Sequence, residues 1–203
     1  YKEAAKNALV LRMSLLRYFY TIFFEISENG GSFWRPLFFE FPEDNGAVND
    51  PEHSFMIGKA LKFTPVLKSV GENGTVDSYF PPNTKFIDII TWEIIQGRGK
   101  IEQLPARWDF PLIHMKEGTI IPYQAFADAS TTDQLVKERF INLFIFPDHN
   151  KNADGTVFVD SDGISTFSLD TNTHQYYRLT FSDRMIRFVL VDGYDAGGRL
   201  DMN

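Results

Sequence analysis

The chain has 203 residues, enough for one or two domains with a substantial core. Apolar residues make up 43% and aromatic residues 15%, which excludes a disordered chain and favours β structure. The formal net charge is −7, with acids and bases interspersed, so there is no basic stripe for a nucleic acid partner. The chain has no cysteine, which excludes disulfides, thiol catalysis and cysteine-bound metals. No apolar run reaches the roughly 18–20 residues that cross a bilayer, so we expect no membrane span.

The first segment, residues 2–28, predicts one long helix. It lacks Pro and Gly, its apolar residues recur at helical spacing, and Asn29-Gly30-Gly31 supplies a left-handed stop. Apolar side chains occur on nearly every face, which indicates burial on several sides. No other segment predicts a helical layer that could cover it, so we expect its partners to lie outside the chain. A chain lacking them should self-associate through this helix. The start, Tyr1-Lys2-Glu3, has no signal-peptide pattern and indicates part of a longer chain.

From residue 32 onward, short apolar runs alternate with turn residues, which is typical of β-sandwiches or barrels. The first run, 32–41, contains Pro36, so we expect an edge strand or a bulge there. A polar loop is predicted at 42–52, and the small, polar residues 128–133 mark the predicted domain boundary. Further strands are predicted at 60–67, 75–80, 86–92, 100–104, 112–116, 119–122, 137–146, 156–159, 175–181 and 185–191.

Six stretches between residues 8 and 165 resemble glycoside hydrolase family 31, in that family's order. The first, ALVLRMSLLRYFYT at 8–21, resembles the last helix of its catalytic barrel, although Met13 replaces a Tyr and Arg17 replaces a Pro. The second, RPLFFEFP at 35–42, resembles the strand that opens its proximal C-terminal domain. The others are HSFMIG at 53–58 with TPVL at 64–67, LPA at 104–106, GTIIPYQ at 118–124, and GTVFVDSDGIS at 155–165, where VDSDG replaces a Trp-Asp-Asp-Gly turn.

This resemblance implies a mainly β fold: two β-sandwich domains, proximal and distal C-terminal, preceded by one long α-helix left from a (β/α)8 barrel. The implied division is 1–30 for the last barrel helix, 31–127 for the proximal sandwich, and 128–203 for the distal sandwich, in whole or in part. The resemblance lies with the maltase-glucoamylase, sucrase-isomaltase and lysosomal alpha-glucosidase branch. It implies a location in the secretory pathway, lysosomal or extracellular.

The resemblance also implies what this chain lacks. Family 31 enzymes retain anomeric configuration with two carboxylates, which must lie ~5–5.5 Å apart across the glycosidic bond. The family's nucleophile lies in a Trp-x-Asp-Met-Asn-Glu motif, and its acid/base Asp and substrate-binding His follow, all before the last barrel helix. Here only Asp201-Met202-Asn203 repeats three letters of that motif. We therefore expect no catalytic residue, no cofactor and no metal in this chain.

Three functional hypotheses follow. In the first, the chain is a C-terminal fragment that scaffolds the barrel of an alpha-glucosidase and is inactive alone; the whole enzyme releases terminal alpha-linked glucose from alpha-glucan oligosaccharides. In the second, it is a β module that binds starch or another glucan. In the third, it is a proteolytic product that remains docked to the catalytic barrel.

Several local patterns have a functional and a structural interpretation. Glu40, Glu43 and Asp44 form a carboxylate cluster, for which solvated loop acids are the favoured interpretation. Residues 148–154 have the alternating oxygen ligands of a calcium loop, but lack the Gly and Glu of an EF-hand, so a turn is favoured. A turn is likewise favoured for Asp160-Ser161-Asp162-Gly163.

The remaining patterns give little support for a site. The histidines have no metal-pair spacing, and Gly97-Arg98-Gly99 lacks the helix and Lys of a phosphate loop. Asn73-Gly74-Thr75 is a formal N-glycosylation acceptor at Asn73 on a predicted turn. Five aromatic residues could stack on sugar rings, although core packing is the favoured interpretation. The histidines are His53, His114, His149 and His174, and the aromatic residues are Trp92, Trp108, Tyr123, Tyr176 and Tyr177.

Overall fold

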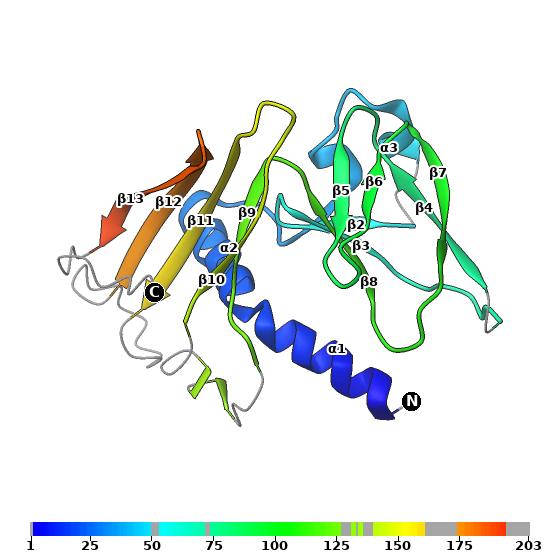
Figure 1. Cartoon of the computed structure of the whole chain (residues 1–203), viewed down its shortest axis with the longest axis horizontal. Coiled ribbons are helices and arrows are strands. Elements are labelled where there is room, and N and C mark those ends of the chain that lie inside the picture. The colour runs from blue at the N-terminus through cyan, green and yellow to red at the C-terminus, as the bar shows by residue number, and fades with distance from the viewer. Residues whose placement is uncertain are drawn as a thin grey trace. The chain divides into compact units, whose positions relative to one another are not determined.

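The computed structural model describes residues 2–49, 53–71, 74–126, 131–132, 134–135, 140–160 and 174–193. The chain divides into two compact units, the first comprising Tyr1–Ala8 and Gly31–Thr119, and the second Leu9–Gly30 and Ile120–Asn203. Strands dominate the described residues of both units (Figure 1), which confirms the prediction of a mainly β fold. The division at 1–30, 31–127 and 128–203 stays a prediction.

Between residues 31 and 119, the described part of the first unit has eight strands and two short helical elements: β1 (Trp34–Pro36), η1 (Leu37–Phe39), α3 (Asn45–Asn49), β2 (Phe55–Ile57), β3 (Leu61–Thr64), β4 (Thr75–Phe80), β5 (Lys85–Asp88), β6 (Ile94–Gln96), β7 (Lys100–Pro105) and β8 (Leu112–Lys116). Six of the strands form an antiparallel sheet in the order β1-β2-β3-β8-β5-β6, and β4 pairs with β7 in a second sheet. One core cluster joins Phe80 and Leu104 of the small sheet to Phe86 and Leu112 of the large one. The two sheets therefore pack through apolar side chains, as in a β-sandwich.

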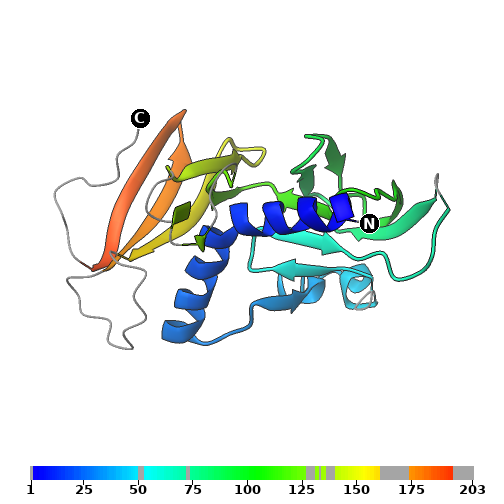
Figure 2. The same ribbon diagram turned by 90° about the horizontal axis from the view of Figure 1, so that it is seen from below.

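The N-terminal segment is two helices, α1 (Lys2–Ser14) and α2 (Leu16–Asn29), so the prediction of one long helix is wrong at Leu15. Figure 2 shows the helices, in blue, meeting at an angle. The Ser14 carbonyl accepts a hydrogen bond from the Gln124 N–H, and the Ser14 hydroxyl accepts one from the Phe126 N–H. Since this carbonyl bonds outside the helix, a tertiary contact accompanies the break.

The described part of the second unit forms a five-stranded sheet with α2 on one face. Its strands are β9 (Thr119–Tyr123), β10 (Asn142–Phe146), β11 (Ala153–Asp160), β12 (His174–Ser182) and β13 (Met185–Gly193), in the order β10-β9-β11-β12-β13. Along β11, Val157 points into a core with Ile120 and Leu179. Phe158 points to the opposite face, where its ring stacks on Phe24 of α2 with centroids 4.1 Å apart. This follows from the alternation of side chains along a strand.

The packing of α2 adds to the expectation that the partners of this helical segment lie outside the chain, because one face of α2 is covered within it. Its buried residues include Tyr18, Ile22 and Phe24, and it lies against β11 of the same unit. A sheet, rather than a helical layer, buries one face of α2. Elsewhere the helical segment stays accessible, with Leu9 of α1 56% exposed and Phe23 of α2 54% exposed.

Strand predictions failed mainly where elements are short. The run at 32–41 becomes β1 followed by the 3-10 helix η1 directly after Pro36, and the polar loop at 42–52 contains α3. The strand predicted at 86–92 ends at Asp88, and the three-residue strands β2 and β6 had no prediction. Among the described residues, no helix is both long and apolar enough to cross a membrane.

Candidate functional site: a buried polar cluster and the turn it supports

A row of polar side chains crosses the centre of the six-stranded sheet in the first unit. In the antiparallel register, Lys62 of β3 is opposite His114 of β8, and His114 is opposite Asp88 of β5. Directly opposed residues in a sheet point to the same face, so the three side chains form a continuous row. Lys62 is 0% exposed, His114 1% and Asp88 6%. Buried polar groups on three adjacent strands need partners, because each is costly to remove from water.

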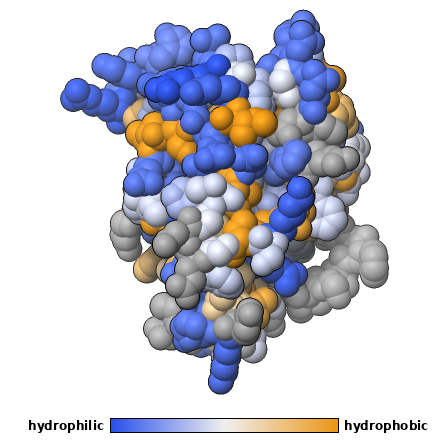
Figure 3. Space-filling view, turned by 90° about the vertical axis from the view of Figure 1, so that its right-hand side faces the viewer, coloured by the Kyte–Doolittle hydropathy of each residue, from blue (hydrophilic) through white to orange (hydrophobic). Residues whose placement is uncertain are grey.

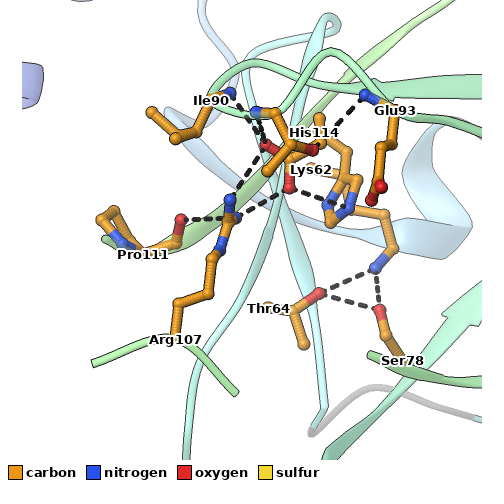
Figure 4. Close-up of polar contacts among 10 residues, drawn as sticks. Lys62, Thr64, Ser78, Ile90, Glu93, Arg107, Pro111 and His114 are labelled. Carbon is orange, nitrogen blue, oxygen red and sulfur yellow. Dashed lines mark hydrogen bonds and ion pairs between the residues drawn. The ribbon is translucent and has the colours of Figure 1, made fainter. Parts of the chain in front are cut away.

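Lys62 forms one end of this row. Its Nζ donates hydrogen bonds to Thr64 Oγ1 at 3.0 Å and to Ser78 Oγ at 2.5 Å, and the two hydroxyl oxygens lie 2.8 Å apart. Nζ also lies 4.3 Å from the centroid of the Phe80 ring, a cation–π distance. Figure 4 shows the two hydroxyls converging on the Lys62 amine. These contacts offset part of the cost of burying an ammonium group.

Asp88 forms the other end of the row and is held by Arg107. Two guanidinium nitrogens of Arg107 contact the two carboxylate oxygens of Asp88, at 2.7 and 3.3 Å. Arg107 also donates to the Pro111 carbonyl at 3.3 Å, which fixes the plane of the guanidinium. Such two-pronged pairs are both stronger and more directional than single contacts.

His114 lies between these charges and stays neutral at ordinary pH. Burial, reinforced by the positive charge of Lys62, lowers the pKa of His114 to about 3, and Asp88 only partly opposes this shift. The His114 Nε2 is 3.8 Å from Asp88 Oδ2, and the buried Nδ1 has no hydrogen-bond partner among the described residues. His114 therefore separates the Lys62 and Asp88 ends of the row as an uncharged ring.

The carboxylate of Asp88 also shapes the turn between β5 and β6. Its Oδ1 accepts hydrogen bonds from the N–H groups of Ile90 and Thr91, at 2.8 and 3.0 Å. The Asp88 carbonyl accepts from the Trp92 N–H, and the Asp88 N–H donates to the Glu93 carbonyl, both at 2.9 Å. The turn carries an unusual residue, because Trp92 has φ 63°, in the left-handed region, and is 55% exposed.

The cluster is built for support rather than for glycoside cleavage. Retaining hydrolysis needs two carboxylates facing one substrate, and Asp88 is the only carboxylate side chain in the described bonds of this cluster. That carboxylate is already engaged by Arg107 and by turn N–H groups, and little of it reaches solvent. The arrangement can fix strands and a turn, but it offers no free acid or nucleophile.

The predicted carboxylate cluster near residue 40 does not come together as a site. Glu40 bridges Arg35 and Lys116, with oxygen–nitrogen distances of 2.5 and 3.4 Å and a side chain only 11% exposed. Asp44 accepts hydrogen bonds from the Tyr79 hydroxyl at 2.8 and 2.9 Å. The interpretation as solvated loop acids is therefore wrong for Glu40 and Asp44, which both hold tertiary contacts.

The two predicted turns fare differently. Asp148 Oδ1 accepts hydrogen bonds from the N–H groups of Asn150 and Asn152, each at 2.9 Å, and Lys151 has φ 64°. This is a tight turn closed by its own aspartate, so the turn interpretation of 148–154 is confirmed. At the second turn only Asp160 is described. Residues 161–163 and the acceptor Asn73 lie outside the described residues.

Some of the histidines and aromatic residues named as candidates are buried or bonded within the fold, and others are exposed. Among the described residues, no three or more His, Asp or Glu side chains gather as a metal site. His174 is buried beside Asp192, at 3.2 Å, whereas His53 and His149 are exposed. Of the five aromatic residues proposed for sugar stacking, Tyr123 stacks on Phe144, Tyr176 bonds Glu25 and Tyr177 is core.

The other two, Trp92 and Trp108, are 55% and 58% exposed. Trp108 borders a hollow of about 250 Å³ in the first unit, lined also by Ala4, Phe63 and Phe110. Figure 3 shows one face of the molecule, on which hydrophobic residues form separate patches within a largely hydrophilic surface. Single exposed hydrophobic residues are normal on protein surfaces, so the exposure of Trp92 and Trp108 does not by itself identify a binding site.

A second polar network fixes α2 to the sheet of the second unit. The buried Arg17 donates to Gln124 Oε1 at 3.2 Å and to the Phe158 carbonyl at 3.3 Å, and lies 3.8 Å from Asp160. The Thr21 hydroxyl accepts a hydrogen bond from the Phe158 N–H at 3.0 Å. Burial lowers the pKa of Arg17 from its usual value, and Asp160 opposes that shift. The position where the family pattern has Pro thus carries the central contact of this network.

Sequence reasoning missed Lys62, Asp88 and Arg107. In Leu61-Lys62-Phe63 the alternation suggests that Lys62 faces solvent, and Asp88 and Arg107 are 19 residues apart. The signal that could have found them is a lysine inside an otherwise apolar strand, together with an Asp at the end of another. Neither pattern specifies a pairing without the strand order.

Three comparisons bear on identity. Residues 30–121 match the model of the Glycosyl hydrolase family 31 C-terminal domain. Intestinal sucrase-isomaltase of Oryctolagus cuniculus is 34% identical over 169 residues, which cover 83% of this chain and 9% of that protein. The alpha-glucosidase of Hordeum vulgare is 34% identical over 163 residues, covering 80% of this chain and 18% of that protein.

The same similarity appears in three dimensions. A crystal structure of the glucosidase II alpha subunit has a TM-score of 0.81, with 21% identity over 93% of this chain and 20% of that one. Another solved structure of that subunit is described as part of an ER glucosidase II heterodimer. At this identity the likeness concerns the fold.

The fold and the cluster together define the class of protein. The chain is a mainly β chain whose fold is similar to a part of large glucosidases, and its central polar cluster is structural. The chain belongs to glycoside hydrolase family 31, which confirms the resemblance found in the sequence. It spans only 9% to 18% of the length of the curated relatives named above.

Proposed function

We propose that this chain is a non-catalytic C-terminal region of an alpha-glucosidase, supporting a catalytic barrel supplied by the rest of the protein. The whole protein cleaves terminal alpha-linked glucose from oligosaccharides with retention of configuration. The names of the sucrase-isomaltase and alpha-glucosidase relatives support this substrate class. The ER glucosidase relative and the Asn73-Gly74-Thr75 triplet support a location in the secretory pathway.

The observation that carries the proposal is that three buried or half-buried carboxylates are engaged in hydrogen bonds and ion pairs within the fold. Asp88 is bonded to Arg107, Glu40 bridges two cations, and Glu25 accepts hydrogen bonds from Thr156 and Tyr176 at 2.6 and 2.7 Å. A catalytic acid or nucleophile must instead face substrate, with its partner across the scissile bond. Carboxylates that bond neighbouring strands and a helix, as these three do, indicate that the chain has a supporting role.

A decisive experiment measures hydrolysis of maltose and of a chromogenic alpha-glucoside by the 203-residue chain. We expect no turnover above the buffer rate. Turnover that Asp88→Asn or Glu40→Gln abolishes, while the exposed-residue variant Asp109→Asn leaves it intact, would place chemistry in this chain and refute the proposal. Reconstitution gives the positive arm: the catalytic portion, expressed separately, should bind this chain and be stabilised by it.

The partner surface of this scaffold includes the accessible side of α1. Leu9 is 56% exposed there, and burying an aliphatic side chain of that size against a partner is favourable in free energy. We expect Leu9→Asp to weaken binding to the catalytic portion, and Leu9→Ala, which removes apolar surface without adding a charge, to weaken it less. Without the catalytic portion, the chain should self-associate through this side, which sedimentation velocity detects as a concentration-dependent shift.

A further inference from the structure

One hollow in the first unit has a wall that is almost wholly apolar. It has a volume of about 250 Å³ and is bordered by α1, by the segment after β3 and by the loop before β8. Only three of its lining residues are polar, and two of the apolar ones, Val66 and Trp108, are 48% and 58% exposed. Hydrophobic residues scattered singly are normal, but an apolar hollow bordered by two large exposed ones is a candidate interaction site.

The three polar residues of the wall argue against a small polar ligand such as a sugar. A ligand pocket needs a few free polar groups that fix the orientation of the ligand. Here the Thr64 hydroxyl is bonded to the Lys62 amine, and the Arg107 guanidinium is bonded to the Asp88 carboxylate. The third polar residue, Asp109, is exposed to solvent, so we place it at the rim. The hollow is therefore better suited to an apolar side chain than to a ring of hydroxyls.

Trp108 is presented by the loop between β7 and β8, which the buried polar cluster fixes. Its neighbour Arg107 contacts both carboxylate oxygens of Asp88 and donates to the Pro111 carbonyl at 3.3 Å, which closes the loop (Figure 4). A backbone that is held in place before a partner arrives lowers the entropy cost of binding. Tryptophan is also enriched among the residues that contribute most to protein interfaces. Trp108 is thus placed as an interface anchor.

The shape of the hollow and its place on the chain indicate the partner. In a two-fold dimer a patch meets itself, so two hollows would face each other and leave the space between them unfilled. The occupant must instead bring a protruding apolar group. Ala4 and Ala8 of the wall belong to α1, the helix whose accessible side the proposed function assigns to the catalytic portion. The curated relatives extend far beyond the matched region, of which this chain spans 9% to 18% of their length, so they have a large further surface.

We propose that this hollow is a docking site for an apolar side chain carried by the catalytic portion of the same protein. Trp108 anchors the contact on one side of the hollow, and the small side chain of Ala8 leaves room for the incoming group on the other. The inference rests on the proposed function and gives it a place on the first unit. A stable interface buries ~800 Å² on each partner, so the contact extends beyond the hollow, with the anchor as its most important part.

Oxidative footprinting of Trp108 tests this docking without any variant. Hydroxyl radicals should modify Trp108 about tenfold more slowly in the full-length protein than in the 203-residue chain, because a docked side chain reacts only while the contact is open. Mass spectrometry of the peptide that contains Trp108 gives the two rates. Equal rates would overturn the proposal. Protection of Trp108 in the 203-residue chain by maltoheptaose would show a glucan site instead, and would overturn it as well.

A variant that fills the hollow separates it from its surroundings. Ala8→Phe places a ring in the hollow, so the rate at Trp108 in the full-length variant should return toward that of the 203-residue chain. Ala8→Ser, which leaves the hollow open, is the matched control and should keep Trp108 protected. Because Ala8 is exposed, both variants of the 203-residue chain should unfold at the urea midpoint of wild type. Full protection of Trp108 in Ala8→Phe would show that the hollow is not used, and the wild-type comparison decides the matter if that variant does not fold.

Activity distinguishes this inference from the proposed function on which it rests. A full-length protein that hydrolyses maltose, but in which Trp108 reacts as fast as in the 203-residue chain, keeps the proposed function and refutes the docking site. A full-length protein that is inactive on maltose and on a chromogenic alpha-glucoside, but protects Trp108, refutes the alpha-glucosidase assignment. It keeps the docking site, with the rest of the protein as the partner.

Discussion

Removing the Asp88 carboxylate tests whether the polar cluster stabilises the first unit. Asp88→Ala leaves the Arg107 guanidinium without its bidentate partner and removes the acceptor of two turn N–H groups. Breaking a buried ion pair by deleting one member costs about 3–5 kcal/mol. A domain is stable by only ~5–15 kcal/mol, so the loss should be a large part of the total. We expect the urea midpoint of the first unit to fall accordingly.

Tryptophan fluorescence is a suitable probe, because the three tryptophans of the chain, at 34, 92 and 108, all belong to the first unit. Asp109→Ala is the matched control: it makes the same charge change at an exposed site and should shift stability by no more than about 0.5 kcal/mol. In the Asp88→Ala background, Arg107→Met should restore part of the loss, since the unpaired cation is then removed. A loss below about 1 kcal/mol for Asp88→Ala, or strictly additive double-variant effects, would refute this account of the cluster.

Two further predictions concern the same unit. The pKa of His114 falls from its ordinary value of 6.5 to about 3 on folding, so the unfolded chain binds an extra proton between those values. Unfolding free energy should therefore fall by about 1.4 kcal/mol per pH unit below pH ~6.5, a slope that His114→Gln removes and His149→Gln, at an exposed site, does not. Gly97→Ala should destabilise by about 1–3 kcal/mol, because a Cβ there would lie 1.9 Å from the Pro81 carbonyl oxygen. Gly71→Ala, where a Cβ meets nothing within 4 Å, should be close to neutral in the same urea titration.

The sequence predicted elements well where local chemistry decides them. The strand predicted at 75–80 matches β4 and the one at 112–116 matches β8, because β-rich runs there end at turn residues. The end of the helical segment at Asn29-Gly30 also matches, since Gly30 takes φ 72°. Family membership came from ordered motifs, which do not depend on knowing the strand order.

Features that depend on distant partners could not be predicted. The break at Leu15 accompanies a bond from Gln124, more than a hundred residues away in the chain. Lys62 is buried because Thr64 and Ser78 converge on it, and those hydroxyls meet only once β3 and β4 are placed. The left-handed backbone of Trp92 follows from bonds to Asp88, and no Gly, Pro or Asn in the turn signals it.

The second unit is discontinuous in the chain, and this has a consequence for its synthesis. Thr21 on α2 meets the Phe158 N–H 137 residues later, with the whole of Gly31–Thr119 made in between. At ~5–20 residues per second, a ribosome needs on the order of ten seconds to supply β11 after α2 has emerged. During that interval the apolar face of α2 has no native sheet to cover it, whereas most of the first unit's chain is already complete. Although α2 is made before the sheet that covers it, it is thus among the last elements of the chain to reach its native environment, and chaperone protection would matter most in that interval.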